Sequence, residues 1–129
     1  MTMMFVNLPV KDLPASRSFF GKLGYSFNEQ FSDDTAACMV VSDSNFVMLI
    51  TEPKFREFIT GSISDARKGT EVITCLTAAS RAEVDEKLAT ALAHGAKAWK
   101  PNMEMGPMYG CSFQDLDGHV WEYMFMDQS

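Results

Sequence analysis

An internal duplication constrains this chain more than any other feature, because the same order of strand and helix signals occurs twice. In the first half, residues 4–10 alternate as a strand does, Asp12 and Pro14 open a helix, and Gly24 ends it. Three further runs have strand character, at 25–31, 36–41 and 46–51. Residues 4–51 therefore predict the order strand, helix, strand, strand, strand.

Residues 71–126 repeat this order. Residues 71–77 form a strand pattern, and Ser80 with Glu83 makes a capping box that opens a helix ended by His94-Gly95. Three strand patterns follow, at 97–100, 109–114 and 119–126. The duplication predicts one α+β domain over all 129 residues, made of two tandem β-α-β-β-β modules that are joined by a connector at 52–70.

Composition argues against several classes of partner. The chain has 11 basic and 17 acidic residues, and its longest basic cluster is Arg67-Lys68, so we expect no nucleic-acid partner. No apolar run approaches the ~18 residues of a membrane span, and the first basic residue is Lys11, so we expect neither a membrane partner nor a signal peptide. Cys38, Cys75 and Cys111 are widely spaced, which predicts reduced thiols in a cytoplasmic protein.

Methionine and the connector supply two further hypotheses. Met103, Met105 and Met108 surround Gly106-Pro107, a pattern that predicts a flexible loop able to form an adaptable pocket wall; ordinary core filling is the alternative. In the connector, Phe55, Phe58 and Ile59 have helical spacing and should be buried against something. A cavity lid, a subunit contact and packing over the sheet edge are all compatible with that spacing.

Two stretches of the sequence resemble those of a known protein family. The first is Asn7-Leu8-Pro9-Val10-Lys11-Asp12-Leu13 leading into Phe19-Phe20-x-x-Leu23-Gly24-Tyr25, and the second is Tyr109-Gly110-x-x-Phe113-x-Asp115-x-Asp117-Gly118-His119-x-x-Glu122. With the duplicated modules, they resemble the vicinal oxygen chelate superfamily, the group of glyoxalase I, bleomycin-resistance proteins, fosfomycin-resistance transferases and extradiol dioxygenases. The resemblance covers essentially the whole chain. It implies that mixed sheets curl into a cup, the glyoxalase/bleomycin resistance fold, and that the protein is a homodimer.

The resemblance also implies where a divalent metal would be held, by side chains of the first and last strands of each module. These positions fall at Phe5, Leu49, Ile73 and Glu122, with Glu71 or Cys75 reachable from Ile73 by a two-residue slip. Only Glu122 matches a metal ligand, and catalytic sites use at least three protein ligands. We therefore expect no bound metal and no other cofactor. A divalent metal held through a shifted strand register is the alternative.

Strand alternation, combined with these matched positions, predicts the lining of the cup. The expected ligand-binding residues are Phe5, Asn7, Val47, Leu49, Ile73, Cys75 and Met124, with Tyr109 at the rim. Trp121, Tyr123 and Phe125 should face the helix instead. A lining that is mostly apolar suits a small, partly hydrophobic or cationic ligand.

Glu122 has three expected roles, and each belongs to a different function. It could act as the catalytic acid or base beside a carbonyl, pair with a cationic ligand, or be a carboxylate hydrogen-bonded to Tyr109, Asn7 or the backbone. Our main hypothesis is a glyoxalase/bleomycin-resistance-like protein that binds a small ligand without a catalytic metal. A metal-dependent lyase or isomerase similar to lactoylglutathione lyase is the alternative. A protein-interaction module with a filled cup is a third hypothesis, so enzymatic activity stays open.

Overall fold

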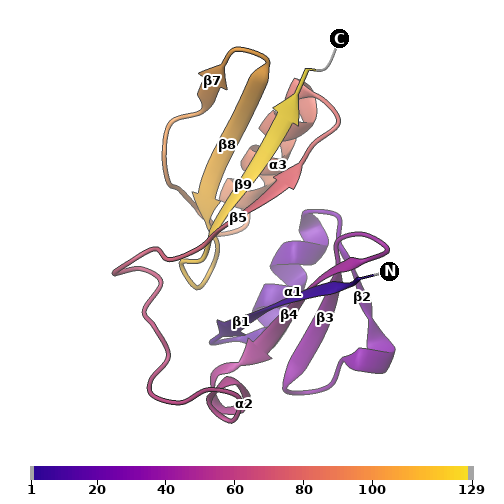
Figure 1. Ribbon diagram of the computed structural model, residues 1–129, viewed down its shortest axis with the longest axis vertical. Coiled ribbons are helices and arrows are strands. Elements are labelled where there is room, and N and C mark those ends of the chain that lie inside the picture. The colour runs from indigo at the N-terminus through magenta and orange to yellow at the C-terminus, as the bar shows by residue number, and fades with distance from the viewer. Residues whose placement is uncertain (1, 128–129) are drawn as a thin grey trace. The chain divides into compact units, whose positions relative to one another are not determined.

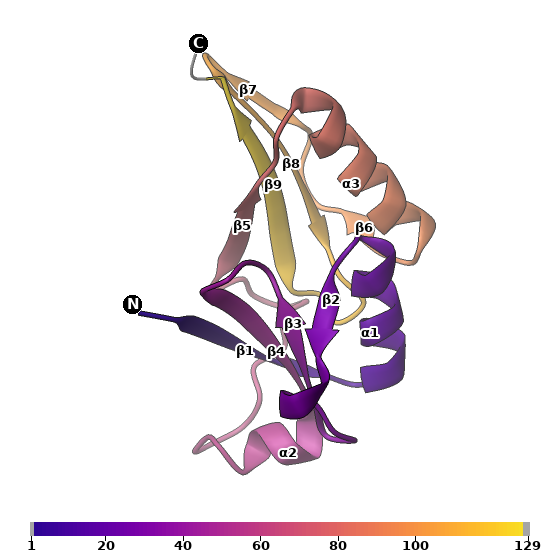
Figure 2. The ribbon, with the colours of Figure 1, turned by 90° about the vertical axis from the view of Figure 1, so that its right-hand side faces the viewer.

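The computed structural model describes residues 2–127, and its elements follow the predicted duplicated order. The chain divides into two compact units that meet in sequence between Ser64 and Asp65. Each unit has a mixed sheet with a helix along one side (Figures 1 and 2). The predicted α+β fold with two β-α-β-β-β modules is confirmed. Within the described residues, no helix is long and apolar enough to cross a membrane.

The first unit has a four-stranded sheet of order β1-β4-β3-β2. Strand β1 is parallel to β4, whereas β3 is antiparallel to both of its neighbours. The elements are β1 (Met4–Val10), α1 (Leu13–Lys22), β2 (Ser26–Asn28), the 3-10 helix η1 (Glu29–Phe31), β3 (Ala36–Val40), β4 (Asn45–Thr51) and α2 (Glu52–Arg56). Residues 29–31, which the sequence predicts as strand, are a 3-10 turn, capped by the Asn28 side chain accepting from the backbone N–H of Gln30.

Helix α1 begins where the sequence places it. The Asp12 carboxylate accepts a hydrogen bond from the backbone N–H of Ala15 at 3.0 Å, so it satisfies one donor that the first helical turn leaves without a partner. The helix covers the sheet face that carries Phe27, because the Arg17 guanidinium lies 4.7 Å from the centre of the Phe27 ring. Val47 and Leu49 share this face through the strand register and are almost fully buried.

The second unit has a sheet of order β5-β9-β8-β6, with β7 also paired to β8. Strands β5 and β9 are parallel, and the β8–β9 and β7–β8 pairs are antiparallel. The elements are β5 (Ile73–Thr77), α3 (Arg81–Ala93), β6 (Lys97–Ala98), β7 (Met103–Met105), β8 (Met108–Gln114) and β9 (Val120–Met126). The prediction of a flexible loop at 103–108 is wrong: Gly106-Pro107 is a tight turn between two paired strands.

Helix α3 confirms the predicted capping box. The Ser80 hydroxyl accepts from the Glu83 N–H at 3.0 Å, and the Glu83 carboxylate accepts from the Ala79 N–H at 2.9 Å, one residue before the usual partner. The helix packs on the sheet face that carries Cys111, whose thiol donates to the Val84 carbonyl at 3.7 Å. Tyr123 pairs with Cys111 and so lies on the same helix-facing side, as predicted.

The Asp-x-Asp-Gly-His motif forms the turn between β8 and β9, and Asp115 holds it together. One oxygen of the Asp115 carboxylate accepts from the backbone N–H groups of Asp117 at 2.9 Å and His119 at 3.0 Å. The other oxygen accepts from the Trp121 indole N–H at 2.8 Å. The Asp115 side chain is buried, and burial raises its pKa, while nearby His119 and the three donors oppose that rise. The motif is therefore a structural device that fixes where β9 begins.

Arg67 ties the start of the second unit to this turn. Its guanidinium donates to the Leu116 carbonyl at 2.6 Å. Gly118 has a φ of +89°, and a Cβ there would lie 2.6 Å from the Arg67 Cγ. Only glycine fits this position, because it allows both the left-handed backbone and the close approach of Arg67.

We predict that Asp115→Asn lowers the free energy of unfolding by about 1–3 kcal/mol, because an amide cannot accept all three hydrogen bonds. The loss should also depend on pH. Since the folded-state pKa of Asp115 is raised above 3.8, its contribution to stability is fully present below 3.8 and falls as the pH rises through the folded-state value.

Urea unfolding of the wild type and Asp115→Asn from about pH 4 to about pH 7 measures this difference. The stability gap should narrow as the pH rises. Asp43→Asn, which makes the same charge change in an exposed turn of the first unit, is the control. A gap that widens with pH would contradict the raised pKa.

Candidate functional site

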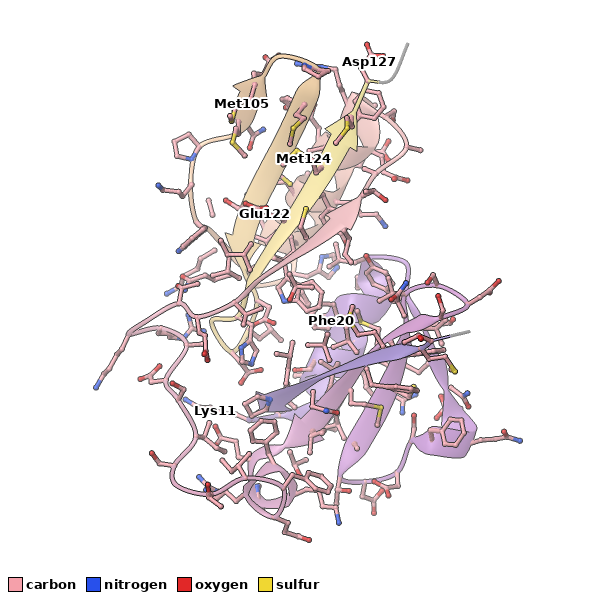
Figure 3. All side chains as sticks on the ribbon, in the orientation of Figure 1. Lys11, Phe20, Met105, Glu122, Met124 and Asp127 are labelled. Carbon is pink, nitrogen blue, oxygen red and sulfur yellow. The ribbon has the colours of Figure 1, made fainter. Side chains whose placement is uncertain are left out.

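The candidate site lies on the face of the second sheet that α3 does not cover, which we call the helix-free face. The strand register assigns to it Ile73, Cys75 and Thr77 of β5, Val120, Glu122, Met124 and Met126 of β9, Met108, Gly110, Ser112 and Gln114 of β8, Met103 and Met105 of β7, and Lys97 of β6. Figure 3 shows the labelled Met105, Glu122 and Met124 side chains in front of this sheet, with α3 behind it. Glu122 is the one acidic side chain that the described register places on this face.

Glu122 and Cys75 form a pair at the centre of the face. They are directly opposite in the parallel β5–β9 pair, and the thiol is hydrogen-bonded to the carboxylate. Burial raises the pKa of the Cys75 thiol above its ordinary value of 9.0, and the charge of Glu122 and this hydrogen bond raise it further. The thiol therefore stays protonated at neutral pH, where it is a hydrogen-bond donor rather than a nucleophile.

The surroundings of this pair are mainly apolar. Ser112 lies opposite Glu122 on β8, and its hydroxyl accepts from the Lys100 backbone N–H at 3.2 Å. Met124 lies two residues along β9 on the same face, and Ile73 lies beside Val120. The structure thus brings together Glu122, Cys75, Ile73 and Met124 of the expected site residues. Sequence reasoning missed Ser112, because a serine in a buried strand has no local signal that separates it from a packing residue.

The first unit also has a sheet face that its helix does not cover. The residues on this face differ in part from those that the sequence predicted to line the cup. Phe5 and Asn7 pair with Phe46 and Met48, and the Phe5 and Phe46 rings stack with centroids 4.8 Å apart. Val47 and Leu49 lie on the opposite face, against α1, so they do not share a surface with Phe5 and Asn7 as expected. The segment 46–50 is apolar at every position, so its alternation could not show which side chains face the helix.

Tyr109 lies on the helix-facing side and not at the rim of a site with Glu122. Its hydroxyl donates to the Asp85 carboxylate at 2.5 Å and accepts from the Asn102 amide at 3.0 Å. The Arg81 guanidinium lies 4.0 Å from the centre of its ring. Strand β8 places Tyr109 and Glu122 on opposite faces, which rules out the expected hydrogen bond between them. Tyr109 instead anchors β8 to α3.

The donor set does not fit a divalent metal site of three or more protein ligands. In the part of the chain that the structure describes, no group of three or more His, Cys, Asp and Glu side chains could hold a metal. Cys75 and Glu122 supply two donors, and His94 Nδ1 lies 3.0 Å from the Thr90 carbonyl of its own helix. The third ligand that such an ion requires is missing from this face of the second unit.

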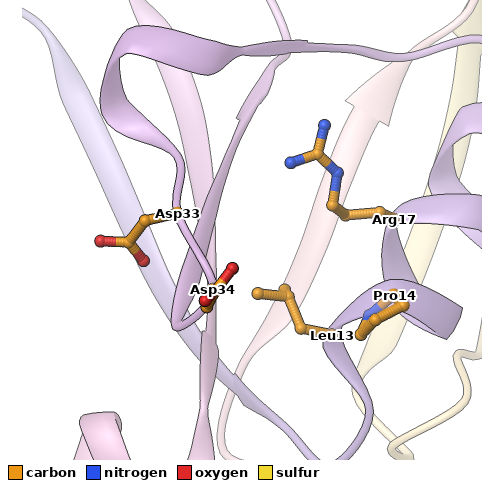
Figure 4. Close-up of a pocket in the computed structure, with 5 residues that line it drawn as sticks. All are labelled: Leu13, Pro14, Arg17, Asp33 and Asp34. Atoms are coloured by element: carbon orange, nitrogen blue, oxygen red, sulfur yellow. The ribbon is translucent and has the colours of Figure 1, made fainter.

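A separate cavity of about 580 Å³ lies in the first unit, lined by Leu13, Pro14, Arg17, Asp33 and Asp34 (Figure 4). Two of its polar side chains already have partners. Arg17 is paired with Glu29, and Asp33 accepts hydrogen bonds from the backbone N–H groups of Thr35 and Ala36. These contacts organise the loop before β3, so the cavity is a weaker candidate than the Glu122 face.

Comparisons with known proteins agree with this fold. Residues 2–42 match the family model described as bleomycin resistance protein-like N-terminal. A hypothetical protein, SA1046 from S. aureus, is 25% identical, with a TM-score of 0.83 over 97% of this chain and 94% of that chain. A search of curated protein sequences found no match.

Two further solved structures carry functional names. A glyoxalase/bleomycin resistance protein/dioxygenase family enzyme from Burkholderia phytofirmans PsJN is 16% identical, with a TM-score of 0.81 over 98% of this chain and 99% of that chain. The fosfomycin resistance protein FosX from Listeria monocytogenes, complexed with Mn(II) and sulfate, is 17% identical, with a TM-score of 0.72 over 98% and 90%. The first module therefore matches the bleomycin-resistance-like model, and the chain as a whole has the glyoxalase/bleomycin resistance fold, as the predicted resemblance implies.

Proposed function

We propose that this protein binds a small organic ligand, with an apolar body and a cationic group, at the helix-free face around Glu122. The observation that carries the proposal is that Glu122 is the one acidic side chain the described register places on this face, beside Val120 and Met124 and opposite Cys75 and Ser112. A negative charge on an apolar surface interacts with a ligand cation more strongly than one surrounded by other polar groups.

We propose that this binding takes place without a catalytic divalent metal and in the cytoplasm. The proposal that no catalytic metal takes part rests on the possible metal ligands. This face offers two of them, Cys75 and Glu122, instead of the three that such a site needs. The proposal of a cytoplasmic location rests on the cysteines, because those among the described residues are all free thiols, with Cys38 and Cys111 buried.

A metal-dependent lyase or isomerase is the second candidate function. The observation that favours it is the Mn(II) complex of the fosfomycin resistance protein, whose fold this chain shares. Glu122 and Cys75 would then be two of the ligands, or Glu122 would be the base. This candidate needs a third donor from outside the face described above.

The ligand proposal predicts that Glu122→Gln weakens the binding of small arylalkylamines, which are cations at neutral pH, by about tenfold, while uncharged isosteres of the same amines bind equally to both proteins. Isothermal titration calorimetry with matched amine and alcohol pairs measures this difference. Glu71→Gln, which removes an exposed carboxylate just before β5, is the control for net charge. An equal loss for charged and uncharged compounds would contradict the ion pair.

Stoichiometric manganese or zinc in the purified protein, lost in Glu122→Gln, would favour the metal-dependent enzyme.

The Glu122–Cys75 pair predicts a second effect of the same substitution. Glu122→Gln removes the negative charge that raises the Cys75 pKa, so Cys75 should be alkylated by iodoacetamide faster at neutral pH than in the wild type. Mass spectrometry of tryptic peptides identifies the labelled cysteine, and the buried Cys38 and Cys111 serve as internal references. An unchanged rate at Cys75 would show that the carboxylate does not act on the thiol.

We also propose that the protein is a homodimer that uses the apolar end of α2. Phe58, which follows α2, is 65% exposed, and it has helical spacing with Phe55 in this connector. We expect Phe58→Ser to shift the molecular mass measured by light scattering from dimer to monomer at micromolar concentration. Phe31→Ser, at a phenylalanine 63% exposed on η1, should leave the mass unchanged. A monomeric wild type would refute the proposal.

A further inference from the structure

Methionine side chains gather at one end of the helix-free face of the second sheet. Met105 pairs with Met108, which pairs with Met126, so these three residues form one row across β7, β8 and β9. The next row is Met103, Gly110 and Met124. Paired residues point to the same face, so five of the chain's 10 methionines share this small area.

Gly110 leaves a space that the Met124 thioether fills. A Cβ at Gly110 would lie 2.9 Å from the Met124 sulfur and 2.8 Å from its methyl carbon, so the thioether lies over the glycine. Met103 lies beside Gly110 on β7, and Met108 lies two residues before it on the same face of β8. Three methionines on one face of the sheet are therefore neighbours of Gly110, and the thioether of one of them, Met124, lies directly over it.

The exposure of these residues suits a site that an ion can enter from solvent. Met124 is 8% exposed and Met103 and Met108 are half-buried. The outer methionines, Met105 and Met126, are 59% and 47% exposed. A thioether is neutral and needs no deprotonation, and its flexible side chain adapts to a ligand.

Thioether chemistry selects the ion. Soft sulfur ligands favour Cu(I), whereas Mg²⁺, Ca²⁺ and Mn²⁺ prefer oxygen ligands. Three neutral thioethers leave the charge of a cation uncompensated, and Glu122, two residues from Met124 on the same face, supplies one negative charge nearby. The arrangement matches a monovalent soft ion in both ligand type and charge.

We propose that Met103, Met108 and Met124 form a three-coordinate Cu(I) site above Gly110. This site differs from the one proposed for the organic ligand because its ligands are sulfur atoms; the two proposals share only the nearby charge of Glu122. Apolar packing is the competing explanation of a methionine cluster. Leucine separates the two, because Met→Leu nearly conserves side-chain volume and hydrophobicity and removes the sulfur.

The test measures Cu(I) binding to the full chain in the presence of ascorbate, by competition with bicinchoninate. We expect one equivalent to bind to the wild type. Met103→Leu, Met108→Leu and Met124→Leu should each weaken binding by more than about tenfold, and the triple variant should abolish it. Met48→Leu, at a half-buried methionine in a strand of the first unit, is the matched control and should bind normally. Normal binding by the triple variant would overturn the proposal.

Two variants separate the thioether site from other sources of binding. Cys75→Ser should retain Cu(I), because the thiol lies outside the proposed ligand set; loss of binding would show a thiolate site instead. Gly110→Ala removes no sulfur, but its Cβ would displace the Met124 thioether, so Cu(I) binding should weaken. Unchanged binding by a folded Gly110→Ala would contradict the geometry. Far-UV circular dichroism verifies folding, and the leucine variants decide the proposal on their own if the alanine variant is unfolded.

A redox-inert probe distinguishes this proposal from the proposed ligand function. Native mass spectrometry with Ag(I), also a soft monovalent ion, should show one bound ion in the wild type and none in the triple leucine variant. The Met103→Leu/Met108→Leu double variant, which leaves Met124 beside Glu122 unchanged, should lose Ag(I) binding but still bind the arylalkylamines whose binding Glu122→Gln weakens. Loss of Ag(I) binding with amine binding intact would support both proposals, and an absence of Ag(I) binding by the wild type would overturn the metal site alone.

Discussion

The parallel pairing of the first and last strands of each module is the constraint on which the rest of the structure depends. Two parallel strands need a long crossover connection, and in both units the remaining elements of the module supply it, beginning with a helix that covers one face of the sheet. The helix does not cover the other face, which is therefore available to bind a ligand. Because side chains alternate along a strand, the register of this one pair decides which residues reach that face. In the second unit it sets Cys75 opposite Glu122 and so forms the candidate site.

The family motif near the end of the chain has a structural role that supports this pairing. Its first aspartate, Asp115, accepts hydrogen bonds from both backbone and indole N–H groups of the β8–β9 turn, and the turn fixes the register between those strands. A slip of one residue would move Glu122 to the helix-facing side. Asp115 therefore affects the candidate site indirectly. Its buried carboxylate fixes the strand register that places Glu122 on the helix-free face, although Asp115 itself does not lie on that face.

Local signals predicted most of the fold, and their failures have physical causes. The caps at Asp12 and Ser80 and the turn at 115–118 were correct, because each depends on residues close in sequence. Strand β7 was missed because Gly106-Pro107 fits a loop as well as a tight turn. The predicted face of Val47 and Leu49 was wrong, because a strand that is apolar at every position shows no alternation of polar and apolar residues to indicate which side chains face the helix. Tyr109 was misplaced because its partners, Asp85 and Arg81, come from a helix well before it in the chain.

The sequence by itself determined the duplicated module, the positions of the helices and the turn that starts β9, because these follow from short-range hydrogen bonding and from repeated hydrophobic patterns. Only the tertiary structure decided which side chains share a face. The Glu122–Cys75 pair and the methionines around Gly110 come from strands that are separated in sequence and joined by hydrogen bonds across the sheet. Such contacts depend on register, which is set by the packing of a whole sheet against its helix rather than by any one segment.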